Sequence, residues 1–183
     1  MKKNQQVVFE GRIIRLTLDT VTLPNDSTCE LEIVHHPGGT AIVTIDADHR
    51  LCLLRQFRHA AGGWIWELPA GKLETGEAPL ATAQRELTEE AGVEARDWQP
   101  LGKILSSPGV FTEVIHLFLA RDLVEVPSQN EAHEVIEVHW FPWSEALAMA
   151  ERGEIEDGKT LAGILRARPQ VEAGCAVSLK QDN

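Results

Sequence analysis

Five carboxylates lie within one short stretch, residues 71–93, whose sequence is GKLETGEAPLATAQRELTEEAGV. They are Glu74, Glu77, Glu86, Glu89 and Glu90, and the last three stand with Arg85 near the end of a segment that has helical spacing. Like charges three or four residues apart destabilise a helix by a few tenths of a kcal/mol per pair. Their accumulation therefore indicates that a cation neutralises them, and hard carboxylate oxygens suit Mg²⁺ or Mn²⁺ rather than zinc.

The spacing predicts a helix from Pro79 to Ala91. Proline fits the first turn because its missing N–H has no helical partner there, and Gly92 fits the left-handed position just past the last turn. One buried stripe is expected, formed by Leu80, Ala83, Leu87 and Ala91. Before the helix, WIWELPAG at 64–71 predicts a strand that runs into a loop and doubles back. This arrangement places backbone carbonyls near the carboxylates.

A run of acidic residues is usually a solvated helix face, and Glu89-Glu90 alone would favour that interpretation. The full pattern is far more specific. It comprises Gly71, five residues, Glu77, seven residues, Arg85-Glu86-Leu87, one residue, Glu89-Glu90, one residue and Gly92-Val93. This pattern resembles the Nudix box, with every fixed position at the required spacing. The resemblance implies a Nudix hydrolase, which cleaves a nucleoside diphosphate linked to another moiety.

Size and composition exclude several classes of protein. A chain of 183 residues predicts one domain with a short appended element. The formal net charge of −11 argues against a nucleic-acid binder, which needs a basic surface. Cys29, Cys52 and Cys175 form no metal-ligand pattern, and this sparse, odd count fits a reducing cytoplasm. We find no signal peptide and no stretch of transmembrane length, so we expect a cytoplasmic protein without a membrane partner.

The expected elements interleave without a regular strand–helix rhythm, which disfavours a doubly wound parallel sheet. Alternating β-branched residues predict two strands within 7–23 and further strands at 30–35, 40–46, 51–56, 98–105, 114–120 and 135–142. Helices are expected at 144–152, with Ser144 as N-cap, and at 157–166, with a frayed tail from Pro169. We expect Trp64 and Trp66 on opposite faces of their strand, one in the core and the other stacked on a base or packed at a subunit interface.

The fold class that fits this order is α+β, and the Nudix resemblance implies an α/β/α sandwich with a mixed β-sheet and an N-terminal antiparallel β extension. We accordingly divide the chain into the extension at 1–36, a Nudix hydrolase domain at 37–168 and a flexible tail at 169–183. In similar proteins such an extension builds a dimer. The resemblance therefore also implies a homodimer.

Segments outside the box resemble the ADP-ribose pyrophosphatase branch of the family. They are Arg55-Gln56-Phe57-Arg58, the run GGWIWELPAGK at 62–72, and Ser107-Pro108-Gly109 with Glu113. The branch usually has an arginine before a glutamate in the strand at 30–35, where this chain has Leu31 before Glu32. That difference leaves room for other nucleoside diphosphate sugars. The absence of tyrosine disfavours diadenosine polyphosphates.

Carried over residue by residue, the resemblance implies a metal site. Glu86 and Glu90 are its expected primary ligands, with Glu89 beside them or acting through water. The backbone carbonyl of Ala70 is expected to complete the coordination of Mg²⁺ or Mn²⁺. Arg85 is expected to orient the glutamates by pairing with them.

The resemblance also implies a substrate site. Arg58 is expected to contact the diphosphate, because its planar fork of donors suits phosphate oxygens, and Glu113 is expected near the terminal ribose. Arg55 and Ser107 are further candidates for substrate binding. Glu134 is expected to be a mobile carboxylate that closes over the substrate, and either it or a box glutamate is the candidate general base.

Simpler interpretations stay open for several of these residues. Arg55 and Arg58 are also compatible with solvated charges at a strand end, and the segment 107–109 with an ordinary turn. His35 and His36 precede a turn and lack a partner at metal-site spacing, so we expect them to be structural.

The resulting hypothesis is metal-assisted hydrolysis of ADP-ribose or a related nucleoside diphosphate sugar. The products would be a nucleoside monophosphate and a sugar phosphate. Three alternatives are a hydrolase of GDP-mannose type, a house-cleaning pyrophosphatase of nucleoside triphosphates, and a non-catalytic Nudix-like ligand sensor. The intact box carboxylates disfavour the sensor.

Overall fold

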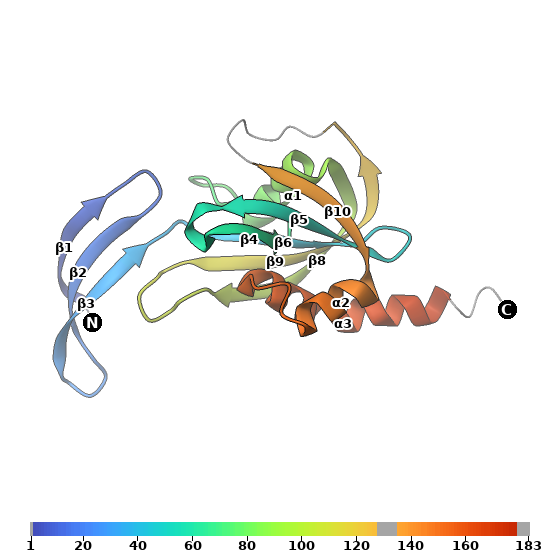
Figure 1. Ribbon diagram of the computed structural model, residues 1–183. Coiled ribbons are helices and arrows are strands. Elements are labelled where there is room, and N and C mark those ends of the chain that lie inside the picture. The colour runs from blue at the N-terminus through green and yellow to red at the C-terminus, as the bar shows by residue number, and fades with distance from the viewer. Residues whose placement is uncertain (1, 128–134, 179–183) are drawn as a thin grey trace.

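The computed structural model of the chain describes residues 2–127 and 135–178. Its N-terminal part is an antiparallel sheet of three strands, which stands to the left of the main body in Figure 1. These strands are β1 (Lys2–Glu10), β2 (Arg15–Thr22) and β3 (Thr28–His35), in that order. The two early strands are therefore present as expected, although the first already begins at Lys2.

The main body contains two further sheets. A four-stranded mixed sheet has the order β7 (Ala70–Lys72), β4 (Gly39–Thr44), β9 (Val114–Glu125) and β8 (Val93–Leu105). Strands β4 and β9 are parallel, and the other neighbours are antiparallel. A three-stranded antiparallel sheet has the order β10 (Ile136–Pro142), β5 (Arg50–Arg58) and β6 (Gly63–Glu67). A short 3₁₀ helix, η1 (His59–Ala61), joins β5 to β6.

Helices cover the strands on both sides, with α1 (Pro79–Ala91) opposite α2 (Trp143–Glu151) and α3 (Gly158–Ser178) (Figure 1). Strand β4 is buried throughout and serves both cores. Ile42 packs with Ala83 and Leu87 of α1, whereas Ala41 and Val43 belong to the larger core that includes residues of α2 and α3. This division follows from the alternation of side chains along a strand. The layered arrangement confirms the expected α+β class.

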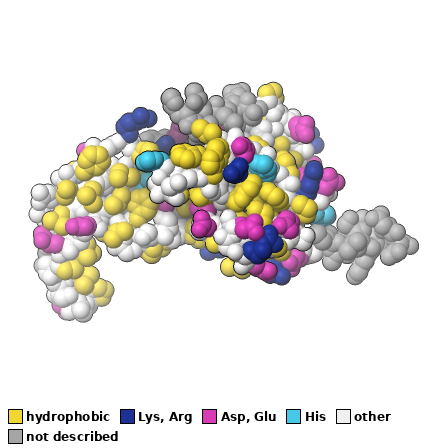
Figure 2. Space-filling model, viewed as in Figure 1, with side chains coloured by type: hydrophobic (Ala, Val, Ile, Leu, Met, Phe, Trp, Pro, Cys, Tyr) yellow, Lys and Arg dark blue, Asp and Glu magenta, His cyan; other side chains and the backbone are white. Residues whose placement is uncertain are grey.

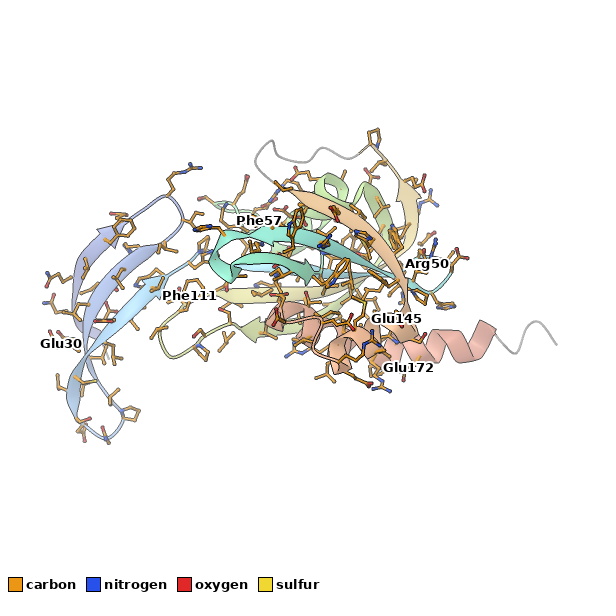
Figure 3. The ribbon with its side chains drawn as sticks, in the orientation of Figure 1. Glu30, Arg50, Phe57, Phe111, Glu145 and Glu172 are labelled. Atoms are coloured by element: carbon orange, nitrogen blue, oxygen red, sulfur yellow. The ribbon has the colours of Figure 1, made fainter. Side chains whose placement is uncertain are left out.

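The extension is joined to the main body through β3. Val34 forms a parallel bridge to Phe111, and its N–H donates to Val110 O at 2.7 Å. His36 packs its ring 5.2 Å from that of Phe111, which Figure 3 shows at the junction between the N-terminal sheet and the main body. This contact brings the end of β3 next to the loop before β9.

Helix α1 begins at Pro79 and ends before Gly92, whose φ of 65° is left-handed, as predicted. The expected buried stripe is wrong at Leu80, which is 39 % exposed because it lies in the first turn, before the helix reaches the core. Thr82 and Glu90 are buried instead. A hydrophobic pattern predicted this face only in part, because one of its buried members is a carboxylate.

The ends of α2 and α3 also differ from expectation. Ser144 is not an N-cap, since α2 begins at Trp143; the N–H of Trp143 donates to His49 O at 3.0 Å, so a backbone carbonyl satisfies this helix end. Helix α3 does not end at Arg166 and does not fray at Pro169, because it continues to Ser178. Val171 is buried in the core, which stabilises this continuation, and Pro169 lies on the exposed side of the helix.

Trp64 and Trp66 point to the same face of β6, so the expectation of opposite faces is wrong. Two residues apart in a strand means one shared face: Trp66 pairs with Arg55, and Trp64 pairs with Phe57. Trp66 is partly buried and packs against the larger core, as expected for one of the two, whereas Trp64 is 41 % exposed in the single chain. None of the helices in the described residues is long and apolar enough to cross a membrane.

Gly163 marks a close approach between α3 and the sheet. A Cβ atom there would lie 2.6 Å from Leu68 Cδ1 and 3.1 Å from Val43 Cγ2. Gly163→Val should therefore lower the free energy of unfolding by about 1–3 kcal/mol through overpacking, despite the better helix propensity of valine. Urea denaturation measures the change. Ala173→Val, at an exposed position of the same helix, should change the free energy of unfolding by less than about 0.5 kcal/mol. Equal effects of the two variants would contradict the prediction.

Candidate active site

The box carboxylates gather where α1 lies beside β7. Gly71 of β7 makes this approach possible, because a Cβ atom at this residue would lie 1.8 Å from Glu86 Cδ and Oε1. Any side chain there would have to displace the Glu86 carboxylate. The glycine at the start of the box is thus explained by contact between the helix carboxylate and the strand backbone.

One guanidinium connects the carboxylates of α1. Arg85 Nη1 donates to Glu86 Oε1 at 2.8 Å and to Glu89 Oε2 at 3.1 Å, and Nε donates to Glu77 Oε1 at 3.2 Å. Its Nη2 also reaches Lys72 O at 3.5 Å. A rigid fork of five N–H donors can serve several acceptors at once. Arg85 therefore offsets much of the repulsion that the sequence pattern implied.

This contact changes the acidity of Glu77. The hydrogen bond from Arg85 is the main cause that lowers the pKa of Glu77 from 4.5 to about 2, with smaller contributions from Thr82 and the backbone N–H of Glu74. The same bond raises the pKa of Arg85 further above its usual value, against the opposing effect of burial. Both groups are consequently charged across the physiological pH range.

Glu90 occupies a different place from its neighbours. Its side chain is 2 % exposed, and its Oε2 accepts the Ala70 N–H at 2.8 Å. A buried carboxylate needs such a partner, because an unpaired buried charge is very costly. Glu90 therefore connects the end of α1 to the strand that carries Gly71.

A cavity of about 870 Å³ opens beside this cluster. Its walls come from the box, from β4, β5 and the loop before β9, and from the start of α3. The polar and charged residues that line it are His36, Thr40, Arg58, Lys72, Glu74, Arg85, Glu86, Glu89, Ser106, Glu113, Asp157 and Lys159. The volume lies within the range of small-ligand sites, about 300–1,000 Å³. The box is therefore one wall of a ligand-sized pocket.

The structure brings most of the candidate residues together. Arg85, Glu86, Glu89, Ala70, Arg58 and Glu113 all line the cavity, and Glu90 lies behind Ala70. Ser107 does not line it, although the preceding Ser106 does. Glu134 lies outside the described residues.

Arg55 is not brought to the cavity. It stands three residues from Arg58 in β5, so the two side chains leave opposite faces of the strand. Arg55 lies over the ring of Trp64, 5.2 Å from its centroid, and pairs with Glu137 at 3.4 Å. The alternation along β5 therefore separates two arginines that the sequence pattern had grouped.

Several cavity residues were missed by sequence reasoning. His36, which we expected to be structural, lines the cavity with Nδ1 3.2 Å from Glu113 Oε1. Burial is the main cause that lowers the pKa of His36, and Glu113 opposes the shift; the Gly38 N–H donates to the same Nδ1 at 3.1 Å, as a neutral ring allows. Lys159 carried no sequence signal, because its partner Glu67 is 92 positions away.

The donors fit a hard divalent cation. Glu86 and Glu89 offer carboxylate oxygens at the cavity wall. The buried hydroxyl of Thr40, opposite Gly71 across the β4–β7 pair, has no hydrogen-bond partner among the described residues. No three acidic, histidine or cysteine side chains in residues 2–127 and 135–178 already converge as a metal site.

Residues 35–164 match the NUDIX domain family. The chain belongs to the Nudix family. This confirms the resemblance drawn from the box and places the match across the main body. Nudix hydrolases generally depend on divalent metal ions.

Similar proteins extend over most of this Nudix chain. An "ADP-ribose pyrophosphatase" of Bacillus subtilis (strain 168) is 36 % identical, covering 87 % of this chain and 88 % of that protein. A "Methanol dehydrogenase activator" of Bacillus methanolicus is 37 % identical, covering 88 % of each. A solved structure described as "Crystal structure of ADP compounds hydrolase" superposes with a TM-score of 0.82 over 95 % of each chain, at 19 % identity. That likeness confirms the fold.

Gly71→Ala should damage the cation site while the fold survives. The added Cβ would overlap the Glu86 carboxylate and force it away from β7. We expect Mn²⁺ to bind about tenfold more weakly or worse, as displaced metal-site groups commonly cause, with little change in far-UV circular dichroism. Electron paramagnetic resonance of Mn²⁺ measures the affinity. Gly109→Ala is a matched control, since nothing lies within 4 Å of a Cβ there; unchanged Mn²⁺ binding in Gly71→Ala would contradict the prediction.

Glu77 should make stability depend on pH in the acid range. Its folded pKa of about 2 lies below the ordinary value of 4.5. The folded state therefore gains stability that is fully present above pH 4.5 and is lost as the pH falls toward 2. The difference in free energy of unfolding between the wild type and Glu77→Gln should accordingly shrink as the pH falls from 4.5 toward 2.

Urea denaturation at a series of pH values tests this prediction. Because Arg85 is the main cause of the shift, an Arg85→Gln background should remove most of the pH-dependent difference. A difference between wild type and Glu77→Gln that stays constant down to pH 3 would show that Glu77 is not held in this way.

Proposed function

We propose that this protein hydrolyses the diphosphate bond of ADP-ribose or a related nucleoside diphosphate sugar, with Mg²⁺ as its metal and Mn²⁺ as a substitute. The products are a nucleoside monophosphate and a sugar phosphate. The observation that carries the proposal is the intact box on α1 and β7, which forms one wall of a cavity that also contains Arg58. The similarity to an ADP-ribose pyrophosphatase over 87 % of the chain supports this substrate class.

Glu86 and Glu90 would hold the metal with the backbone carbonyl of Ala70, and Glu89 would lie beside them or act through water. When bound, it supplies charge to phosphate oxygens and lowers the pKa of a water molecule. The chain's own contribution is positioning. Arg85 keeps Glu86 and Glu89 together on one helix face, which prepares them for the cation before it arrives.

The substrate lies in the cavity with its diphosphate toward Arg58 and its terminal sugar toward Glu113. Arg58 stabilises the charge that develops on phosphate oxygens during the reaction. The general base is Glu134 or a box glutamate. Ser107 stays a candidate for substrate contact next to the cavity, whose wall its neighbour Ser106 lines.

The extension at 1–36 mediates a homodimer in this proposal, and residues 37–168 form the hydrolase domain. Apolar side chains support a buried role for the extension, since Val7, Val8 and Phe9 are 49 %, 58 % and 54 % exposed in the single chain. Figure 2 shows hydrophobic side chains over this sheet. The free thiols of Cys29 and Cys52 fit a cytoplasmic setting.

Glu86→Gln should abolish turnover and spare the fold, because it removes a ligand charge without changing the shape of the side chain. We expect kcat for ADP-ribose with Mg²⁺ to fall about a thousandfold or more, in line with the loss of a strong active-site electrostatic contact. Release of the monophosphate product measures the rate. Glu172→Gln, at an exposed position on α3 (Figure 3), is the charge-matched control. Near-normal activity of Glu86→Gln would refute the assignment.

A substrate panel separates the alternatives. Values of kcat/KM for ADP-ribose, GDP-mannose and the deoxynucleoside triphosphates rank the three hydrolytic functions directly. Higher values for GDP-mannose would favour the sugar-nucleotide alternative. Pyrophosphate release from a triphosphate without cleavage of ADP-ribose would favour a house-cleaning role, and no turnover of any of them would favour a ligand sensor.

A further inference from the structure

A buried carboxylate outside the Nudix box pairs with two positively charged side chains that line the cavity. Glu67, the last residue of β6, has a side chain that is 4 % exposed. Its Oε2 accepts a hydrogen bond from Arg58 Nε at 2.7 Å, and its Oε1 accepts one from Lys159 Nζ. Arg58 and Lys159 both line the cavity, whereas Glu67 lies behind them.

Lys159 is held rigidly at the start of α3. Its Nζ lies 3.0 Å from Asp157 Oδ1, while Asp157 Oδ2 accepts the Thr160 N–H at 2.9 Å and caps the helix. Thr160 Oγ1 in turn accepts the Leu68 N–H at 2.9 Å. Lys159 is therefore anchored both to its own helix and to the strand end that carries Glu67.

The two cations keep donors that point away from these carboxylates. A lysine ammonium has three N–H donors, and Glu67 and Asp157 engage two of those of Lys159. Arg58 uses Nε for Glu67, and its terminal Nη groups make no hydrogen bond within the described residues. Two cations and two carboxylates leave this group neutral, and its remaining N–H donors are available to phosphate oxygens.

We propose that Lys159 and Arg58 form a paired binding site for a diphosphate and that Glu67 is the positioning residue that fixes them. The inference rests on the proposed hydrolase function, which it deepens by naming residues outside the box that bind the substrate in the same cavity. Charged donors held in one geometry bind phosphate oxygens with less ordering cost than free side chains. Lys159 binds as a point charge and Arg58 as a fork.

Removal of the Lys159 charge should weaken binding without blocking chemistry. Lys159→Met keeps most of the apolar stem, so we expect the KM for ADP-ribose and the Kd for inorganic pyrophosphate to rise about 10- to 100-fold, as loss of a charged hydrogen bond does. The kcat should change much less, because the contact forms in both ground and transition states. Lys159→Arg should recover part of the affinity.

Glu67→Gln tests the positioning role. It should raise the same Kd, because Arg58 and Lys159 lose the charge that fixes them. In an Arg58→Met/Lys159→Met background, Glu67→Gln should cause no further loss of affinity, since no cation is left to position. A merely structural carboxylate would not show this dependence.

Isothermal titration calorimetry with inorganic pyrophosphate in the presence of EDTA measures binding on the full chain without turnover. Arg168→Met is the matched control, because it removes a surface cation from the same helix, where Arg168 pairs with Glu172. Circular dichroism melts verify that each variant folds, and a variant that does not fold is replaced by Lys159→Gln or Glu67→Asp.

The outcomes separate this inference from the proposed function. A wild type that cleaves ADP-ribose, with Lys159→Met unchanged in both KM and Kd, overturns the inference alone. A wild type that cleaves none of the substrates but binds pyrophosphate through Lys159 overturns the proposed function alone. A wild type that does neither overturns both, and equal losses in Lys159→Met and Arg168→Met overturn the inference as a nonspecific charge effect.

Discussion

Carboxylates that gather on one helix face repel one another, and in this protein the positive charge of Arg85 compensates them within the chain itself. Its guanidinium contacts Glu77, Glu86 and Glu89 at once. These contacts keep the cluster compact, hold the pKa of Glu77 low and leave the carboxylates at the cavity wall. The arrangement of the box carboxylates therefore depends first on an ion-pair network within the chain.

The rest of the fold brings opposite charges to this cluster. Strand β4 is buried on both faces and lets α1 pack on one side and α3 on the other. The box on α1 provides the acidic wall of the cavity, while β5 and the start of α3 provide Arg58 and Lys159. A diphosphate with bound metal carries both kinds of charge, so a pocket that offers both carboxylate oxygens and cationic N–H donors suits it.

Short-range signals made α1 and its chemistry readable from the sequence. Pro79 and Gly92 define the ends of the helix through local backbone preferences. The spacing of Glu86, Glu89 and Arg85 is likewise local, because residues three or four apart on a helix are neighbours whatever surrounds them. The family, the chemistry and the α+β class all follow from such patterns.

Tertiary packing decided which residues are buried and which distant residues meet, and sequence spacing could not predict either. Whether Leu80 or Glu90 is buried depends on where the helix meets the sheet, and the length of α3 depends on the core around Val171. Lys159 and Glu67 meet across 92 positions. The sequence by itself therefore determined the box, its helix and its cation chemistry, because those contacts are local. Only the tertiary structure decided which cations face the box, because strand pairing and helix packing place them there.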